Sequence, residues 1–85
     1  MAIQPEPPPS AVYLRRVDPT QNISRFYSIR IEKDLFGEWC LVREWGRIGT
    51  IGRTRRDGFP DIGQALDAME KLTKAKKRKG YFEIG

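Results

Sequence analysis

The stretch that decides the fold is residues 38–56, EWCLVREWGRIGTIGRTRR. Residues 39–45 are rich in aromatic and β-branched side chains, which favour a half-buried strand. Gly46, Gly49 and Gly52 mark positions where the backbone turns or closely approaches another segment. Residues 52–57 follow as the return strand. The stretch therefore predicts a β-hairpin that gathers an indole and several guanidinium groups at one corner.

Two further strands are predicted before this hairpin. Residues 11–17 form a short first strand, and residues 18–22, DPTQN, have the composition of a turn. Residues 25–32 alternate, with Tyr27, Ile29 and Ile31 on one face, which predicts a strand with one buried face. In residues 39–45 both faces are partly apolar, so periodicity leaves open which of them packs against the core.

The C-terminal part predicts one long helix. Residues 58–60, GFP, are expected to end the sheet, and Asp61 with Gln64 forms a capping-box pattern. An apolar stripe at residues 62, 65, 66, 69 and 72 extends the helix to about residue 79, where Gly80 is placed to end it. Residues 81–84 return as a short edge strand. The predicted fold class is α+β, a small antiparallel sheet with one long helix packed across one face.

Length and composition favour a single domain at residues 11–85. Of the 85 residues, 39% are hydrophobic and 32% are charged, which suits a small globular domain. Residues 1–10, MAIQPEPPPS, are proline-rich and predict a disordered tail. No apolar run approaches the ~20 residues of a membrane span, and no secretory signal is visible. We therefore expect a cytoplasmic protein with no membrane partner.

The sequence favours a protein without enzymatic activity. It contains no histidine, the commonest general base and zinc ligand. Its single cysteine, Cys40, lies in an apolar strand and is expected to be a buried, inert thiol. The three glycines of the hairpin are spaced by threes, which matches no dinucleotide or phosphate-loop motif. We therefore expect no catalytic residues, cofactor, metal or small-molecule substrate.

Basic residues outnumber acidic ones by 16 to 11, giving a net charge of +5. Those of the hairpin are all arginine and those of the helix end are almost all lysine. Arginine binds phosphate oxygens in pairs and stacks on rings, whereas lysine acts as a mobile point charge. The hairpin is thus predicted to position a nucleic acid, with diffuse attraction from the helix end. A plain alternative is that the lysines only complement the helix dipole.

Trp45 has two interpretations. Tryptophan is usually well buried, which favours a core indole. Its place at a strand end beside Gly46 and Arg47 favours a ring at the rim, where stacking on a base or sugar is worth ~1–3 kcal/mol. Trp39 and Tyr27 are assigned to the core.

The segment REWGRIGT at residues 43–50 resembles the signature of the WGR domain, found in DNA-damage-responsive poly(ADP-ribose) polymerases and in small stand-alone bacterial proteins. Asn22, the RFY run at 25–27 and the GY pair at 80–81 extend the resemblance over nearly everything after residue 10. The resemblance implies a grip on duplex DNA at a break, with Trp45 against the terminal nucleotide and Arg47 near its phosphate. Arg53 or Arg55 would supply a further DNA contact. Glu44 departs from what suits DNA, because its charge adjoins Trp45.

The predicted function is a non-enzymatic nucleic-acid-binding module, for double-stranded DNA or its ends. Duplex RNA is not separated from DNA by phosphate contacts alone. The alternative is a protein–protein adaptor that docks a separate DNA-repair or regulatory enzyme through the sheet edge or the tail. A pure oligomerisation domain is a third option. The candidate nucleic-acid-binding residues are Trp45, Gly46, Arg47, Arg43, Arg53, Arg55, Arg56, Lys76 and Lys77.

Overall fold

The sheet and one helix account for the whole architecture of the computed structural model, which describes residues 11–84. The elements are β1 (Ala11–Asp18), a 3-10 turn η1 (Pro19–Gln21), β2 (Ile23–Lys33), β3 (Trp39–Arg47), β4 (Arg53–Phe59), α1 (Ile62–Arg78) and β5 (Phe82–Ile84). Five strands pair antiparallel in the order β4-β3-β2-β1-β5. The α+β prediction is confirmed, whereas the predicted proline-rich tail at residues 1–10 lies outside the described residues.

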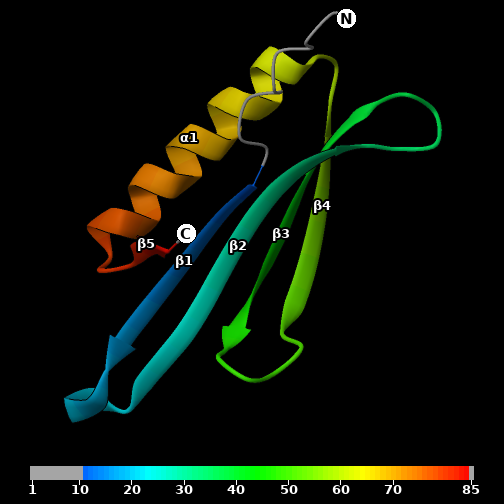
Figure 1. Cartoon of the computed structure of the whole chain (residues 1–85). Helices are drawn as coiled ribbons and strands as arrows, with labels where there is room; N and C mark the ends of the chain where they lie inside the picture. Colours follow the sequence, from blue (N-terminus) through cyan, green and yellow to red (C-terminus); the bar gives the residue numbers. More distant parts are fainter. Residues whose placement is uncertain (1–10, 85) are drawn as a thin grey trace, which may run out of the picture.

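The helix crosses one face of the sheet from one edge to the other (Figure 1). It begins after β4, at one edge, and leads into β5, which pairs with β1 at the other edge. The strands continue well past the C-terminal end of α1, so the β1–β2 and β3–β4 turns lie beyond the helix (Figure 1). Within the described residues, no helix combines the length and apolar character needed to cross a membrane.

Both helix ends are formed as the sequence predicts, with one difference. The Asp61 carboxylate accepts from the Gln64 backbone N–H at 2.8 Å. The reciprocal contact joins the Gln64 side-chain amide to the same carboxylate at 3.3 Å, not to the cap's backbone. At the other end, Gly80 has a φ of 95°, and the Lys76 carbonyl accepts from the Tyr81 N–H at 3.1 Å. This bond turns the chain back toward the sheet.

Four strands run further than predicted: β1 is longer by one residue and β2 by three, and β3 and β4 each end two residues later. β3 continues through Gly46 and Arg47, which pair with Phe26 and Arg25 of β2. β4 continues through Gly58 and Phe59, so the prediction that residues 58–60 end the sheet was wrong by two residues. Pro60, the next residue, has no N–H to donate to the ladder, which accounts for the observed end.

The core lies between the helix and the sheet. Sheet residues Leu14, Tyr27, Ile29, Ile31 and Leu41 pack against Ala65 and Met69 of α1. Leu41 faces the helix, so the face of β3 that carries Trp39, Arg43 and Trp45 is the core face. Cys40 and Val42 point the other way and are nevertheless buried, Val42 completely.

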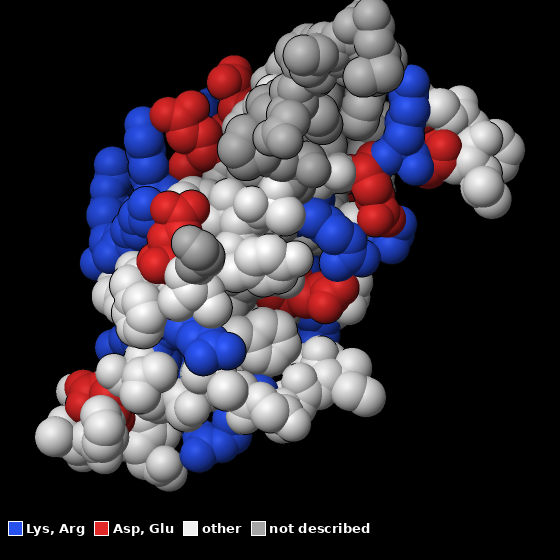
Figure 2. Space-filling view, in the orientation of Figure 1, with Lys and Arg blue, Asp and Glu red and all other residues white. Residues whose placement is uncertain are grey.

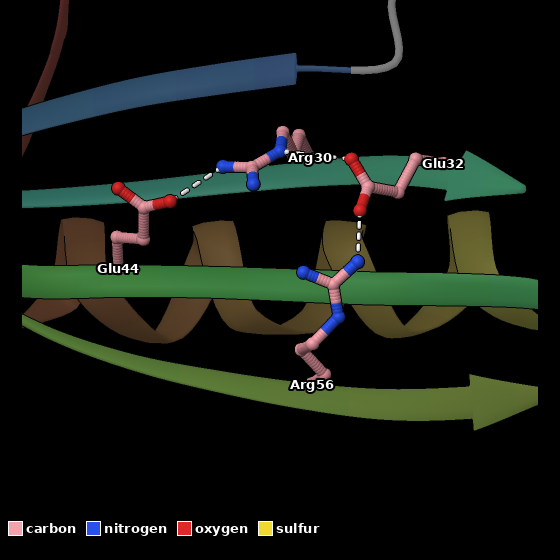
Figure 3. Close-up of polar contacts among 4 residues, drawn as sticks. All are labelled: Arg30, Glu32, Glu44 and Arg56. Atoms are coloured by element: carbon pink, nitrogen blue, oxygen red, sulfur yellow. Dashed lines mark hydrogen bonds and ion pairs between the residues drawn. The ribbon is translucent and has the colours of Figure 1, made fainter. Parts of the chain in front are cut away.

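An ion-pair network lies on the face of the sheet away from α1 (Figure 3), the face to which the buried Val42 also points. Arg30 donates to Glu44 at 2.6 Å and to Glu32 at 3.2 Å. Arg56 reaches across β3 to the other oxygen of Glu32. In the strand register Val42 stands between Arg30 and Arg56, so their aliphatic stems flank it. The pKa of Glu32 is lowered, mainly by the hydrogen bond that it accepts from Arg30. We call Arg30, Glu32, Glu44 and Arg56 the outer network.

Gly46 and Gly52 let the two strands of the central hairpin approach closely. A Cβ on Gly46 would lie 2.8 Å from the Gly52 Cα. A Cβ on Gly52 would meet the Trp45 carbonyl oxygen and the Phe26 ring, and Gly52 has a φ of 75°. The strand carrying Trp45 and Arg47 therefore keeps its position only if neither glycine acquires a side chain.

We predict that Gly52→Ala lowers the free energy of unfolding by about 3 kcal/mol, from left-handed strain together with overpacking. Gly49→Ala is the matched control, because Gly49 also has a positive φ of 92° but a Cβ there meets no atom within 4 Å. It is expected to cost only about 1 kcal/mol. Urea unfolding measures both values, and equal losses would contradict the close approach.

Candidate functional site

A groove of about 850 Å³ opens where the sheet extends past the end of α1. One side is the β1–β2 turn with the start of β2, and the other is the end of β3 with the start of β4 (Figure 1). Lys76 and Tyr81 line it from the end of the helix and the residues after it. Its lining residues are Gln21, Asn22, Ile23, Ser24, Arg25, Tyr27, Trp45, Gly46, Arg47, Gly52, Arg53, Lys76 and Tyr81. We call this the groove.

Strand register brings three arginines into the groove. Arg25 of β2 stands directly opposite Arg47 of β3, and Arg53 of β4 stands opposite Trp45. Like charges placed directly opposite in a sheet are destabilising. No Asp or Glu is among the groove's lining residues, and within residues 11–84 no carboxylate forms an ion pair with these arginines. Within residues 11–84, no ion pair with a carboxylate therefore offsets the repulsion between Arg25 and Arg47.

Aromatic rings form the floor. The Tyr27 and Trp45 rings stack with centroids 6.1 Å apart and planes 24° apart. Tyr81 meets Tyr27 edge-on at 6.3 Å. Trp45 is half-buried: it packs against the core cluster and also lines the groove. Trp45 thus contacts the core, as the first interpretation expects, and also lies at the rim, as the second expects.

Lys76 adds a fourth cation from the helix. Its Nζ lies 4.4 Å from the centroid of the Tyr27 ring and 5.4 Å from that of Tyr81, within the range of a cation–π contact. Burial of the ammonium is the main cause that lowers the pKa of Lys76, followed by repulsion from Lys79, Arg43 and Arg25. Of these three cations, only Arg25 lines the groove.

The backbone of Arg47 is fixed while its side chain stays exposed. The Arg47 carbonyl accepts from the Thr50 N–H at 3.0 Å and from the Thr50 hydroxyl at 2.7 Å. The next residue, Ile48, donates its N–H to the Ser24 carbonyl at 3.0 Å. The guanidinium donates to the Asn22 side-chain oxygen at 3.4 Å, a weak contact across the groove. Asn22 itself has a φ of 53°, which places its amide at the tip of the β1–β2 turn.

Five of the nine candidate residues line the groove, namely Trp45, Gly46, Arg47, Arg53 and Lys76. The other four lie elsewhere, each in an ion pair. Arg43 is beneath the helix, with 18% of its side chain exposed, and donates to Asp57 at 3.0 Å. Arg55, beside it, donates to the same carboxylate at 3.3 Å.

Arg56 and Lys77 are further removed. Arg56 belongs to the outer network, because the alternation of β4 sends it to the face opposite Arg53 and Arg55. Lys77 pairs with Glu83 of β5 at 3.2 Å. The hairpin arginines, which the sequence presents as one cluster, are therefore divided between the two faces of the sheet.

The groove also contains residues that sequence reasoning did not choose. Arg25 and Asn22 carry part of the family resemblance but are not among the nine candidate residues, and Tyr27 is predicted only as a core residue. Their signal was the RFY run before the central hairpin, but only the pairing of β2 with β3 shows that they meet Arg47 and Trp45. Glu44 points to the other face and pairs with Arg30, so its charge does not enter the groove.

Basic side chains also gather outside the groove. In Figure 2 they follow the left side of the molecule, over the C-terminal half of α1, with acidic residues among them. Lys74 pairs there with Glu70 at 2.9 Å. In the part of the chain that the structure describes, no three His, Cys, Asp or Glu side chains come together to hold a metal ion.

Comparison with known proteins gives the family. The model of the WGR domain matches residues 10–85. A curated relative, the uncharacterized protein y4dW of Sinorhizobium fredii (strain NBRC 101917 / NGR234), is 40% identical over 73 residues, which cover 86% of this chain and 36% of the relative. The chain thus spans little more than about a third of that relative's length. Since the family match covers every described residue, the chain belongs to the WGR domain family.

Proposed function

We propose that this chain is a non-enzymatic module that binds double-stranded DNA at or near an end, and that the groove is the binding site. WGR domains are binding modules known for nucleic-acid binding in poly(ADP-ribose) polymerase-like proteins. One observation carries the proposal for this chain: Arg25, Arg47, Arg53 and Lys76 converge on an aromatic floor without a carboxylate among the lining residues.

Charge supports a polyanionic ligand. Arginine side chains suit phosphate oxygens because the planar guanidinium donates two parallel hydrogen bonds. The unfavourable juxtaposition of Arg25 and Arg47 is relieved when a phosphate lies between them. In such a site the repulsion lowers the stability of the free protein, and binding of the anion removes that loss. The ligand would therefore stabilise the fold as well as bind to it.

The aromatic floor supports a terminal nucleotide. Inside a duplex each base pair is stacked on both sides, so only the last one offers a free face. Trp45 is half-buried and stacked on Tyr27, which leaves the indole rigid and partly accessible at the groove. A terminal base or sugar that packs on it gains ~1–3 kcal/mol. This preference for ends agrees with what the family resemblance implies for Trp45 and Arg47.

Fluorescence anisotropy tests the proposal. The probes are a blunt duplex with 5′ phosphates, the same duplex closed by hairpins, a single strand and a duplex RNA. We expect tightest binding to the open DNA duplex, with a log–log salt slope of about −3.6 for four phosphate contacts. Arg47→Ala is expected to weaken binding by about 2 kcal/mol, and Trp45→Ala by ~1–3 kcal/mol. Circular dichroism confirms that each variant is folded.

Arg15→Ala is the matched control for Arg47→Ala. It removes the same charge, but Arg15 is exposed on the face away from α1, opposite Phe26 and Phe82 in the sheet. The affinity of Arg15→Ala for the open DNA duplex is expected to stay close to that of the parent chain. Equal binding to open and closed duplexes would reduce the claim to general phosphate attraction, and no binding to any probe at low salt would overturn it.

The groove also predicts a trade-off between binding and stability. We expect Arg25→Gln to weaken DNA binding yet raise the free energy of unfolding by about 0.5 kcal/mol at low salt, because it removes a like-charge pair. The gain should shrink at high salt, where repulsion is screened. Arg30→Gln, which breaks the outer network, should instead lower stability. Urea unfolding at two salt concentrations measures both, and a loss of stability in Arg25→Gln would contradict the repulsion.

One observation favours a second candidate function, the docking of a partner protein. The β2–β3 turn exposes Leu35 completely and Phe36 to 90%. Hydrogen bonds hold this turn in shape: the Asp34 carboxylate accepts from the Phe36 and Glu38 N–H groups, each at 2.9 Å. The turn projects at the end of the molecule away from the groove (Figures 1 and 2). Exposed apolar residues on an ordered turn are typical of a protein contact. Leu35→Ser with Phe36→Ser should leave every DNA affinity unchanged.

A further inference from the structure

Lys76 differs from the other lysines at the end of α1. Lys71, Lys74, Lys77 and Lys79 are exposed, and two of them have carboxylate partners, Glu70 for Lys74 and Glu83 for Lys77. Lys76 is half-buried, lies over the Tyr27 and Tyr81 rings, and lines the groove. Within residues 11–84 no carboxylate forms an ion pair with it.

This position makes Lys76 a better nucleophile than its neighbours. An amine attacks an electrophile only in its uncharged form, and a site that disfavours the ammonium increases the fraction of that form. Burial and the surrounding cations lower the pKa of Lys76, against the attraction of the Tyr27 and Tyr81 rings for the ammonium.

The groove also selects the electrophile by charge. A site lined by Arg25, Arg47 and Arg53 and lacking carboxylates raises the local concentration of small anions. Arginine favours phosphate among them, because its fork matches two phosphate oxygens. An acyl donor with a phosphate group would therefore be held with its carbonyl carbon in the same groove as the Lys76 amine.

We propose that Lys76 is an acylation site for small acyl phosphates, which the groove arginines recruit. The uncharged Nζ attacks the carbonyl carbon, so a C–N bond forms. The bond from that carbon to the phosphate oxygen breaks, and phosphate leaves with the electron pair. The proton lost by nitrogen goes to the departing phosphate or to water. The step exchanges one acyl bond for another, so no oxidant or reductant takes part.

Acylation changes the groove in a defined way. It replaces an ammonium over two tyrosine rings by an uncharged amide, and so removes one of the four groove cations. This part of the inference rests on the proposed function: the modified chain should bind DNA with a salt slope shallower by about 0.9, the loss of one phosphate contact. Lys76→Gln should bind like the modified chain and Lys76→Arg like the parent.

The test uses acetyl phosphate and the full chain. Mass spectrometry of peptides measures initial acetylation rates at each helix-end lysine. We expect Lys76 to react faster than the unpaired, exposed Lys71 and Lys79 by on the order of tenfold. With p-nitrophenyl acetate, which has no phosphate, the ratio of the Lys76 rate to the Lys71 and Lys79 rates should be smaller. Arg53→Gln should reduce the rate with acetyl phosphate, whereas Arg15→Gln, on the other face, should not.

Two results would overturn the proposal. One is a Lys76 rate no greater than that of Lys79. The other is a lead that Arg53→Gln leaves unchanged although circular dichroism shows the variant to be folded. The readout needs no DNA. A Lys76 lead in a chain that binds no DNA probe would therefore support the modification site while refuting the proposed function, and DNA binding without a Lys76 lead would do the reverse.

Discussion

The pairing of β2 with β3 is the constraint on which the rest of the molecule depends. It sets Tyr27 against Trp45 and Arg25 against Arg47, and it continues through the Ile48 N–H to the Ser24 carbonyl. Because side chains alternate along a strand, a shift of one residue would move every one of them to the other face. The core of Ile29, Ile31 and Leu41 opposes such a shift, so hydrophobic burial at one end of the strands fixes the charged groove at the other.

The outer network and the groove differ in how their positive charges are matched. In the outer network, on the face away from α1, Arg30 and Arg56 are matched by Glu32 and Glu44 (Figure 3). In the groove, three arginines and a lysine stand together without such partners among the lining residues. The first arrangement contributes to the fold alone. The second costs stability in the free protein, and an anionic ligand is what offsets that cost.

Local chemistry made much of the fold predictable. Period-two alternation predicted the strand at residues 25–32, and the Asp61 cap with the Gly80 exit predicted the helix, because each signal lies within a few residues of its effect. The groove was less accessible to such reasoning. Arg25 lies 22 positions before Arg47 in the chain, and only the strand register brings them together. The split of Arg55 from Arg56 follows from strand alternation, but the partners that occupy them, Asp57 and Glu32, come from tertiary packing.

The most direct test of the groove as the binding site is backbone amide NMR during titration with a short duplex that has open ends. We expect chemical-shift changes to concentrate on the two sides of the groove, at Asn22–Arg25 and Trp45–Arg47, with Tyr81 between them. The amide chemical shifts of Arg30 and Arg56, in the outer network, and of Val42, between them in the strand register, should not change. Changes centred on that network or on the exposed lysines of α1, with the groove unaffected, would contradict the account.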